Sequence, residues 1–258
     1  MTYEIFNEDC LEGMKRIDSG AVDMILTDLP YGITACAFDV RIPFEPMWEQ
    51  FKRVTKRNAA IALFSQMPFG AELIMSNRKM FRYEIIWEKS LAAGFLNAKK
   101  MPLRAHENIL IFYGALPTYN PQHWFDKPYQ KPLWQGKVTG NYSQQQHRRD
   151  ISYENPTGKR YPLDVVQFYN PMTHTNTTSI HPQRKPTALL EYLIRTYTNE
   201  GELVLDATMG SGSTGVAAIN TNRRFIGFET ETKFYDIARK RIDEAIAQRE
   251  QSLFKLEA

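Results

Sequence analysis

Hydrophobic and polar positions alternate with two different periods along the first 115 residues. Compact apolar runs predict buried strands at 22–27, 59–65, 83–89 and 107–113. Two segments between these runs, 43–55 and 69–77, have apolar residues at helical spacing and predict helices. Strands that alternate with helices indicate an α/β fold whose sheet is mostly parallel and carries helices on its faces.

Regular periodicity is lost between residues 117 and 180. This segment holds seven of the fourteen prolines and ten aromatic residues, and it carries seven Lys or Arg against four Asp or Glu. Because it is too aromatic for a disordered linker, we expect an ordered insertion that is rich in loops.

The helical period returns at residue 185. One face of the segment 185–198 collects Leu189, Leu190, Leu193, Ile194 and Tyr197. Pro186 stands near the start of this helix, where its missing N–H is harmless. The remaining pattern predicts a strand at 202–207, a helix at 213–220, a strand at 223–229 and a helix at 233–248. The sheet is therefore expected to be built from residues 1–115 and 181–258, with residues 116–180 inserted between them.

Composition is ordinary for a globular protein of this size. The chain has 258 residues, of which 43% are hydrophobic and 24% charged, and its net charge is only +3. Two cysteines are too few for a disulfide framework. With neither a signal peptide nor an apolar run long enough to span a membrane, we expect a cytoplasmic protein without a membrane partner.

A glycine-rich loop, GSGSTG at 210–215, follows one predicted strand and precedes a helix, and Glu229 ends the next strand. This arrangement is typical of a dinucleotide site, or of a turn with a packing role only. However, Asp206 lies four residues before the first glycine, where its carboxylate would repel a pyrophosphate. S-adenosylmethionine has no phosphate and carries a sulfonium, an ammonium and a ribose, so it suits these acids better.

A second unusual turn, DLPYG at 28–32, ends the strand at 22–27. Leu29 precedes a proline and is therefore held extended, which fixes its carbonyl beside the Asp28 carboxylate. Two adjacent acceptors suit an exocyclic amino group with two hydrogens, as on adenine or cytosine, and Tyr31 would stack on the base. The plain alternative is a strand-end turn with a solvated Asp28.

Five segments resemble, in the same order, motifs of the β-class amino DNA methyltransferases. They are NEDC (7–10), DLPYG (28–32), HPQRKP (181–186), DATMGSGST (206–214) and FIGFE (225–229). The resemblance implies a Rossmann-like, S-adenosylmethionine-dependent methyltransferase fold with a circularly permuted order of motifs. It divides the chain into a catalytic half at 1–115, a target-recognition insertion at 116–180 and a cofactor-binding half at 181–258.

The resemblance also implies roles for single residues. The catalytic set is Asp28, Leu29, Pro30 and Tyr31. The cofactor-binding set is Asp9, the Cys10 backbone, Lys185, Asp206, Thr208, Gly210, Ser211, Gly212, Ser213, Thr214 and Glu229. We further expect His106 and Glu107 to shape the target pocket. The chain departs from the family's motifs where Leu29 replaces a proline and Ala207-Thr208 replaces Pro-Phe.

The implied activity is methyl transfer to the N6 amino group of adenine in double-stranded DNA. The target base must leave the stack to reach the donor. The inserted segment, with its basic and amide residues densest at 143–150 and 157–161, is expected to contact phosphates and base edges.

Several alternatives stay open at this point. Cytosine-N4 methylation is the second choice, because Ser usually replaces the motif's Asp in those enzymes of the family. Methylation of a protein glutamine or of RNA, and an inert DNA-binding relative, fit less well with the motif order and the intact turn. A homodimer and a restriction endonuclease partner are compatible with the family. No metal is expected, since His123, His147 and His174 are far apart and lack cysteines beside them.

Overall fold

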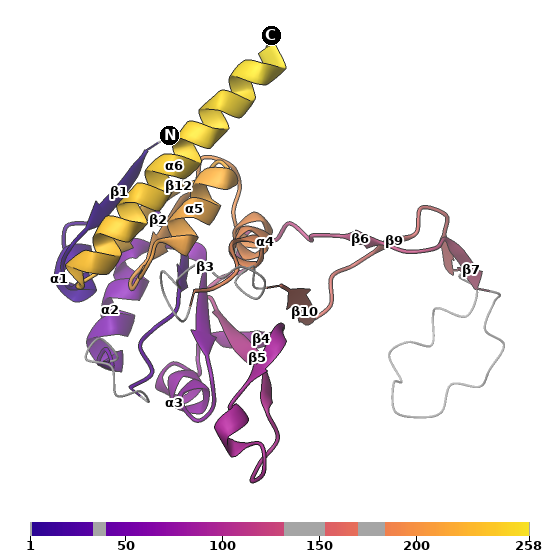
Figure 1. The fold of residues 1–258 in the computed structure, drawn as a ribbon, viewed down its shortest axis with the longest axis horizontal. Helices are drawn as coiled ribbons and strands as arrows, with labels where there is room; N and C mark the ends of the chain where they lie inside the picture. Colours follow the sequence, from indigo (N-terminus) through magenta and orange to yellow (C-terminus); the bar gives the residue numbers. More distant parts are fainter. Residues whose placement is uncertain (1, 33–39, 132–152, 170–183, 258) are drawn as a thin grey trace. The chain divides into compact units, whose positions relative to one another are not determined.

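The computed structural model describes residues 2–32, 40–131, 153–169 and 184–257 (Figure 1). The chain forms two compact units. The first contains Met1–Asn120 and Asp164–Ala258, and the second contains Pro121–Leu163. The second unit lies inside the segment that the sequence predicts to be an insertion.

One eight-stranded sheet organises the first unit. Its strands, in spatial order, are β1 (Tyr3–Phe6), β12 (Arg224–Phe228), β11 (Leu203–Asp206), β2 (Val22–Thr27), β3 (Thr55–Ser65), β5 (Arg104–Phe112), β4 (Phe81–Ala93) and β10 (Val165–Phe168). All neighbouring pairs are parallel except those that β5 makes with β3 and β4. Because β2 pairs with β11, the two ends of the chain share one sheet, as the pattern predicts.

Helices cover both faces of this sheet (Figure 1). They are α1 (Cys10–Met14), α2 (Phe44–Val54), α3 (Phe69–Ser76), α4 (Thr187–Tyr197), α5 (Ser213–Asn220) and α6 (Thr232–Glu257). In β2, Met24 packs in the cluster under α4, α5 and α6, whereas the next residue, Ile25, packs in the cluster under α1, α2 and α3. Successive side chains of a strand point to opposite faces, so a continuous apolar run marks a strand buried on both sides.

The sequence pattern does not predict β1, β10 or α1, which are short elements of the first unit. β1 and β10 have four residues each and are only partly buried, so their apolar signal is short and broken. α1 has five residues, too few to show a helical period. The longer predicted elements are all present, and the predicted apolar face of α4 is buried.

The second unit consists of two small antiparallel ribbons. One pairs β6 (Trp124–Phe125) with β9 (Lys159–Arg160), and the other pairs β7 (Tyr129–Lys131) with β8 (Tyr153–Asn155). Gly158, at φ +69°, lets the chain pass so close to Asp126 that a Cβ would lie 1.9 Å from its carbonyl oxygen. The basic segment predicted at 157–161 contains β9. The other basic segment, 143–150, lies outside the described residues.

Candidate active site

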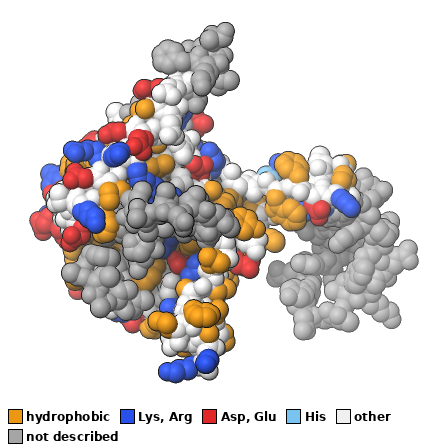
Figure 2. All heavy atoms as spheres, in the orientation of Figure 1, with side chains coloured by type: hydrophobic (Ala, Val, Ile, Leu, Met, Phe, Trp, Pro, Cys, Tyr) orange, Lys and Arg blue, Asp and Glu red, His pale blue; other side chains and the backbone are white. Residues whose placement is uncertain are grey.

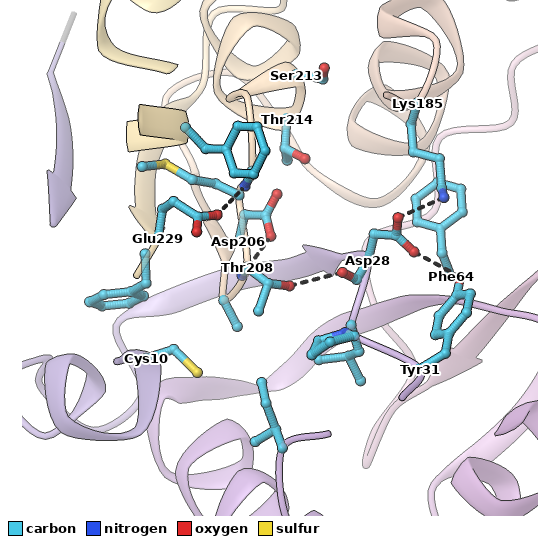
Figure 3. Close-up of a pocket in the computed structure, with 18 of the residues that line it drawn as sticks. Cys10, Asp28, Tyr31, Phe64, Lys185, Asp206, Thr208, Ser213, Thr214 and Glu229 are labelled. Atoms are coloured by element: carbon cyan, nitrogen blue, oxygen red, sulfur yellow. Dashed lines mark hydrogen bonds and ion pairs between the residues drawn. The ribbon is translucent and has the colours of Figure 1, made fainter. Parts of the chain in front are cut away.

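A cavity of about 720 Å³ opens at the carboxyl ends of β2 and β11 (Figure 3). Ligands in open α/β sheets bind at this edge, and the volume is within the usual range for a small-molecule site. Its lining includes the whole predicted catalytic set and every predicted cofactor-binding residue except Gly212. The structure thus brings together two sequence motifs that are about 180 residues apart.

Thr208 joins these two motifs directly. Its hydroxyl donates to the backbone carbonyl of Asp28 at 2.9 Å and lies 2.9 Å from the hydroxyl of Thr27. Thr208 stands where the family's motif has an aromatic residue. The replacement of that aromatic residue by Thr208 therefore adds a hydrogen bond between the loop after β11 and the DLPYG turn.

The carboxylate of Asp28 has a separate donor on each oxygen. The Tyr31 hydroxyl donates to Oδ1 at 2.8 Å, and the Lys185 ammonium lies 2.6 Å from Oδ2 (Figure 3). Lys185, predicted as a cofactor-binding residue, is thus placed against Asp28 of the DLPYG turn. The Tyr31 ring packs on Phe69 with its centroid 5.0 Å away, which fixes the far side of the turn.

Lys185 belongs to a buried chain of charges. Its ammonium also lies 3.0 Å from Glu107 Oε2, and Glu107 Oε1 lies 3.2 Å from the Lys89 ammonium. Burial by itself would lower the pKa of Lys185, but the carboxylates of Asp28 and Glu107 hold that pKa above its usual value. Burial likewise opposes the charge of Glu107, yet Lys185 and Lys89 hold its pKa below the usual value. Both groups are therefore ionised near neutral pH.

Glu107 was expected to shape the target pocket, and it does line the cavity. Its neighbour His106 is exposed and is not among the lining residues. The alternation of side chains along β5 explains the difference, because adjacent residues of a strand face opposite ways.

Leu29 anchors the DLPYG turn through its side chain. The residue is 3% exposed and packs in the core cluster that contains Cys10, Met14 and Phe69. Leu29 also lines the cavity.

Glu229 is held in place by backbone donors. Its Oε2 accepts from the Gly210 N–H at 2.9 Å, and its Oε1 accepts from the Glu231 N–H at 2.9 Å. Burial raises the pKa of this carboxyl, and the backbone hydrogen bonds oppose the rise. The arrangement fixes a carboxylate at the end of β12, where remaining lone pairs can accept the hydroxyls of a ribose.

Asp206 is a buried acid of the cavity with a raised pKa. Burial raises its pKa to about 6, although hydrogen bonds from Thr214, Thr27 and the Thr208 backbone oppose the rise. Its Oδ1 accepts from the Thr208 N–H at 3.1 Å. A bound cation would favour the ionised form of this buried carboxyl.

Arg241 supports the glycine loop from α6, a contact for which the sequence has no signal. Its guanidinium donates to the Ser211 carbonyl, to the Ser211 hydroxyl at 3.0 Å and to the Ser213 hydroxyl at 3.3 Å. Gly212 faces α6 instead of the cavity, at φ +75°, and a Cβ there would lie 2.8 Å from the Cβ of Ala238. The loop is therefore fixed by α6 on the side away from the cavity.

Asp9 and Cys10 begin α1 at the opposite wall. The Asp9 carboxylate caps this helix, accepting from the N–H of Leu11 at 2.8 Å and of Glu12 at 3.3 Å. Burial and the neighbouring Asp9 raise the pKa of the Cys10 thiol to about 12, so the thiol is not a nucleophile.

The acidic residues that line the cavity suit a cationic ligand with hydroxyl groups. Three acids from three strand ends line it, namely Asp28, Asp206 and Glu229, and among the described residues only Asp28 of these three is paired with a lysine. S-adenosylmethionine has this chemistry. Over the described part of the chain, no group of three or more His, Cys, Asp and Glu is placed to hold a metal ion.

A family model described as DNA methylase, for N6- and N4-methyltransferases, matches residues 22–240, and the chain belongs to this family. The predicted resemblance is thereby confirmed. The expected cofactor is confirmed as well, since the family's enzymes depend on S-adenosylmethionine.

Two curated relatives illustrate the family. The DNA adenine methyltransferase YhdJ of Escherichia coli (strain K12) is 30% identical over 261 residues, which cover 93% of this chain and 83% of that protein. The type II methyltransferase M.BglII of Bacillus subtilis is 29% identical over 264 residues, covering 91% of this chain and 67% of that protein.

Solved structures confirm the fold expected from the sequence. The M1.HpyAVI–SAM complex has a TM-score of 0.60 at 23% identity, covering 93% of this chain and all of that one. The cytosine-N4-specific PvuII DNA methyltransferase has a TM-score of 0.63 at 13% identity, covering 94% of this chain and 93% of that one. In the described residues, no helix is long and apolar enough to cross a membrane.

Proposed function

We propose that this protein methylates the N6 amino group of adenine in double-stranded DNA. The observation that supports this most is the geometry around Asp28. A carboxylate ion-paired to Lys185 stands next to the fixed backbone of Leu29, and Thr208 ties both to the glycine loop.

Asp28 and Leu29 form the binding site for the amino group in this proposal. Asp28 Oδ1 accepts one amino hydrogen and the Leu29 carbonyl accepts the other, so the nitrogen lone pair turns away from the ring. This stabilises the tetrahedral nitrogen that develops during the reaction. The Tyr31 hydroxyl releases Oδ1 when the amino group arrives, and in this proposal the Tyr31 ring stacks on the base.

Lys185 positions the carboxylate throughout. It stays on Oδ2, at the 2.6 Å separation seen here, while Oδ1 faces the target. S-adenosylmethionine supplies an electrophilic methyl group when bound. The nitrogen must then lose one proton, and Asp28 Oδ1 is the acceptor already in contact with it.

The choice of adenine is supported by the acidic residue that opens the catalytic turn and by relatives such as the adenine methyltransferase YhdJ. Cytosine-N4 methylation is the second candidate, because the PvuII enzyme has the same fold. A flipped base fits the proposal, since an amino group inside the duplex stack cannot reach the carboxyl ends of β2 and β11. The second unit, with β6 to β9, is the proposed target-recognition element.

The experiment uses tritiated S-adenosylmethionine and unmethylated genomic DNA of mixed sequence. Wild-type protein is expected to transfer label to DNA. Asp28→Asn keeps the shape but weakens the acceptor, and we expect a loss of about 100-fold in rate with cofactor binding retained. Asp18→Asn, on an exposed residue outside the cavity, should match wild type. Unlabelled DNA with wild type would refute the function, and full activity of Asp28→Asn would refute the role of Asp28.

A further inference from the structure

The hairpin that joins β4 to β5 ends in an exposed apolar surface. We call residues 90–104 the hairpin tip. In this tip Phe95 is 81% exposed and Leu96 98% exposed, and Leu91, Met101 and Leu103 are exposed beside them. Figure 2 shows hydrophobic side chains gathered over the projecting β4–β5 hairpin, with positive side chains at its end. So much exposed apolar surface on one projection indicates a binding partner.

The exposed side chains are carried by a hydrogen-bonded turn. Gly94 adopts φ +92°, and the short 3₁₀ helix Phe95–Asn97 follows it. The Asn97 N–H donates to the Gly94 carbonyl at 2.9 Å, and the Met101 N–H donates to the Asn97 carbonyl at 3.0 Å. Phe95 and Leu96 are therefore presented to solvent by a defined backbone.

The charge of the hairpin tip indicates which kind of partner it binds. From Lys89 to His106 the sequence has no Asp or Glu, whereas Lys99, Lys100 and Arg104 are positive. Apolar side chains flanked by lysines match the two parts of DNA that a protein meets when it enters the stack, namely base faces and phosphates.

The hairpin tip also stands at the mouth of the candidate active site. Ala93 pairs with Arg104 across the hairpin, and both residues line the cavity together with Lys89. Phe95 and Leu96 follow Ala93 by two and three residues, so the chain holds them within about 11 Å of the cavity wall. That distance is about three base-pair steps, taking the 3.4 Å spacing of bases along one strand.

We propose that Phe95 and Leu96 form a wedge that enters the base stack of DNA and fills the space left by the flipped target base. Lys99 and Lys100 contact the phosphates on either side. This inference rests on the proposed function, because it assigns the surface that helps the target base reach the Asp28 site. A second copy of this chain is the competing occupant of the hairpin tip.

The test compares a Phe95→Ala/Leu96→Ala double variant with wild type on two DNA duplexes. Both duplexes carry the methylated site found by sequencing DNA from an expressing host. One is fully paired, and the other lacks the base opposite the target, so that its flipping breaks no base pair. The control is a Met75→Ala/Leu116→Ala double variant, which removes two other largely exposed apolar residues that do not line the cavity.

We expect the wedge variant to methylate the paired duplex about tenfold more slowly than wild type, the loss that corresponds to one base–aromatic stacking contact. Its loss on the duplex without the opposing base should be clearly smaller. Cofactor binding should be unchanged, and the control variant should match wild type on both substrates.

Three results would overturn the wedge while wild type remains active. They are full activity of the wedge variant on the paired duplex, equal losses on both duplexes, and a wild-type dimer in sedimentation that the substitutions convert to a monomer. The last result would assign the hairpin tip to chain–chain contact. Wild-type protein that methylates neither duplex would refute the proposed function, and the wedge with it.

Discussion

At the level of single residues, the side chains of the site are positioned by hydrogen bonds and ion pairs with one another. Asp28 faces the cavity with one oxygen on Lys185 and the other on Tyr31, and Lys185 is in turn balanced by Glu107. Removing Lys185 leaves the carboxylate of Asp28 without its ion pair, and removing Glu107 takes away the carboxylate that Lys89 faces. Substitutions of these charged residues are expected to act on rate and stability together, so the sharper tests use uncharged residues that contact the network.

Thr208 offers such a test, because its hydroxyl is the direct bond between the glycine-loop strand and the backbone of Asp28. Thr208→Val keeps the shape and removes that donor. We expect methylation to slow by about tenfold or more, because the hydrogen bonds of this hydroxyl to the Asp28 carbonyl and to the Thr27 hydroxyl are both lost. Thr208→Ser should retain the wild-type rate. A wild-type rate in Thr208→Val together with a slow Thr208→Ser would show that the methyl group matters and not the hydroxyl.

Asp206 predicts a pH dependence of cofactor binding. Burial raises its pKa to about 6, so the free protein gains the negative charge only as pH rises through this value. A cationic cofactor favours the ionised form, and its affinity should therefore increase between pH 5 and pH 7.5. For stability the sign is opposite. The raised pKa makes this carboxyl favour the fold at low pH, and that contribution is lost as pH rises through about 6.

Titration calorimetry of S-adenosylmethionine at several pH values measures the Asp206 effect. Asp206→Asn should flatten the dependence between pH 5 and pH 7.5 and weaken binding at the upper end. An affinity that falls with rising pH in wild type, or an equally steep dependence in the variant, would contradict this role.

At the scale of elements, the glycine loop is positioned by its contact with α6. Gly212 and Gly201 have nearly the same backbone, at φ +75° and φ +78°, but different surroundings. A Cβ on Gly212 would meet Ala238 at 2.8 Å, whereas a Cβ on Gly201 would have no neighbour within 4 Å. An alanine substitution at each position therefore distinguishes the cost of a strained backbone from the cost of a steric clash with α6.

Gly201→Ala should lower the free energy of unfolding by about 1 kcal/mol, the cost of a left-handed backbone for a residue with a Cβ. Gly212→Ala should cost more and should also weaken cofactor binding, because α6 and the loop must separate. Chemical denaturation and calorimetry measure both effects. Similar losses for the two variants, with unchanged cofactor affinity, would mean that the α6 contact does not position the loop.

The sequence predicts some helices and strands better than others. Long apolar runs such as 22–27 and the amphipathic segment 185–198 predict their strand and helix well, because each is buried over its whole length or along one face. The edge strand β10 has four half-exposed residues, and its place beside β4 depends on a contact between distant segments. For the same reason Arg241 and the contact of Lys185 with Asp28 are absent from any local pattern, whereas Asp28 and Glu229 follow from the ends of strands.

At the scale of the whole molecule, the second unit is the proposed DNA-reading element. Lys159 lies exposed on β9, in the segment that the sequence marks as basic. Lys159→Ala should weaken DNA binding to a similar extent on all sequences and reduce the slope of log affinity against log salt by about 1. Cofactor affinity should be unchanged. Lys15→Ala, on an exposed lysine of the first unit, is the matched control. An unaltered salt slope for Lys159→Ala would remove this residue from the DNA contact.

Methyl transfer to the amino nitrogen of adenine leaves a modified nucleoside that can be identified. Mass spectrometry of nucleosides from duplex DNA, after incubation with the protein and S-adenosylmethionine, detects it. We expect N6-methyldeoxyadenosine with wild type and its loss in Asp28→Asn. N4-methyldeoxycytidine in place of the adenine product would overturn the choice of base, and unmodified DNA would overturn the proposed methyl transfer.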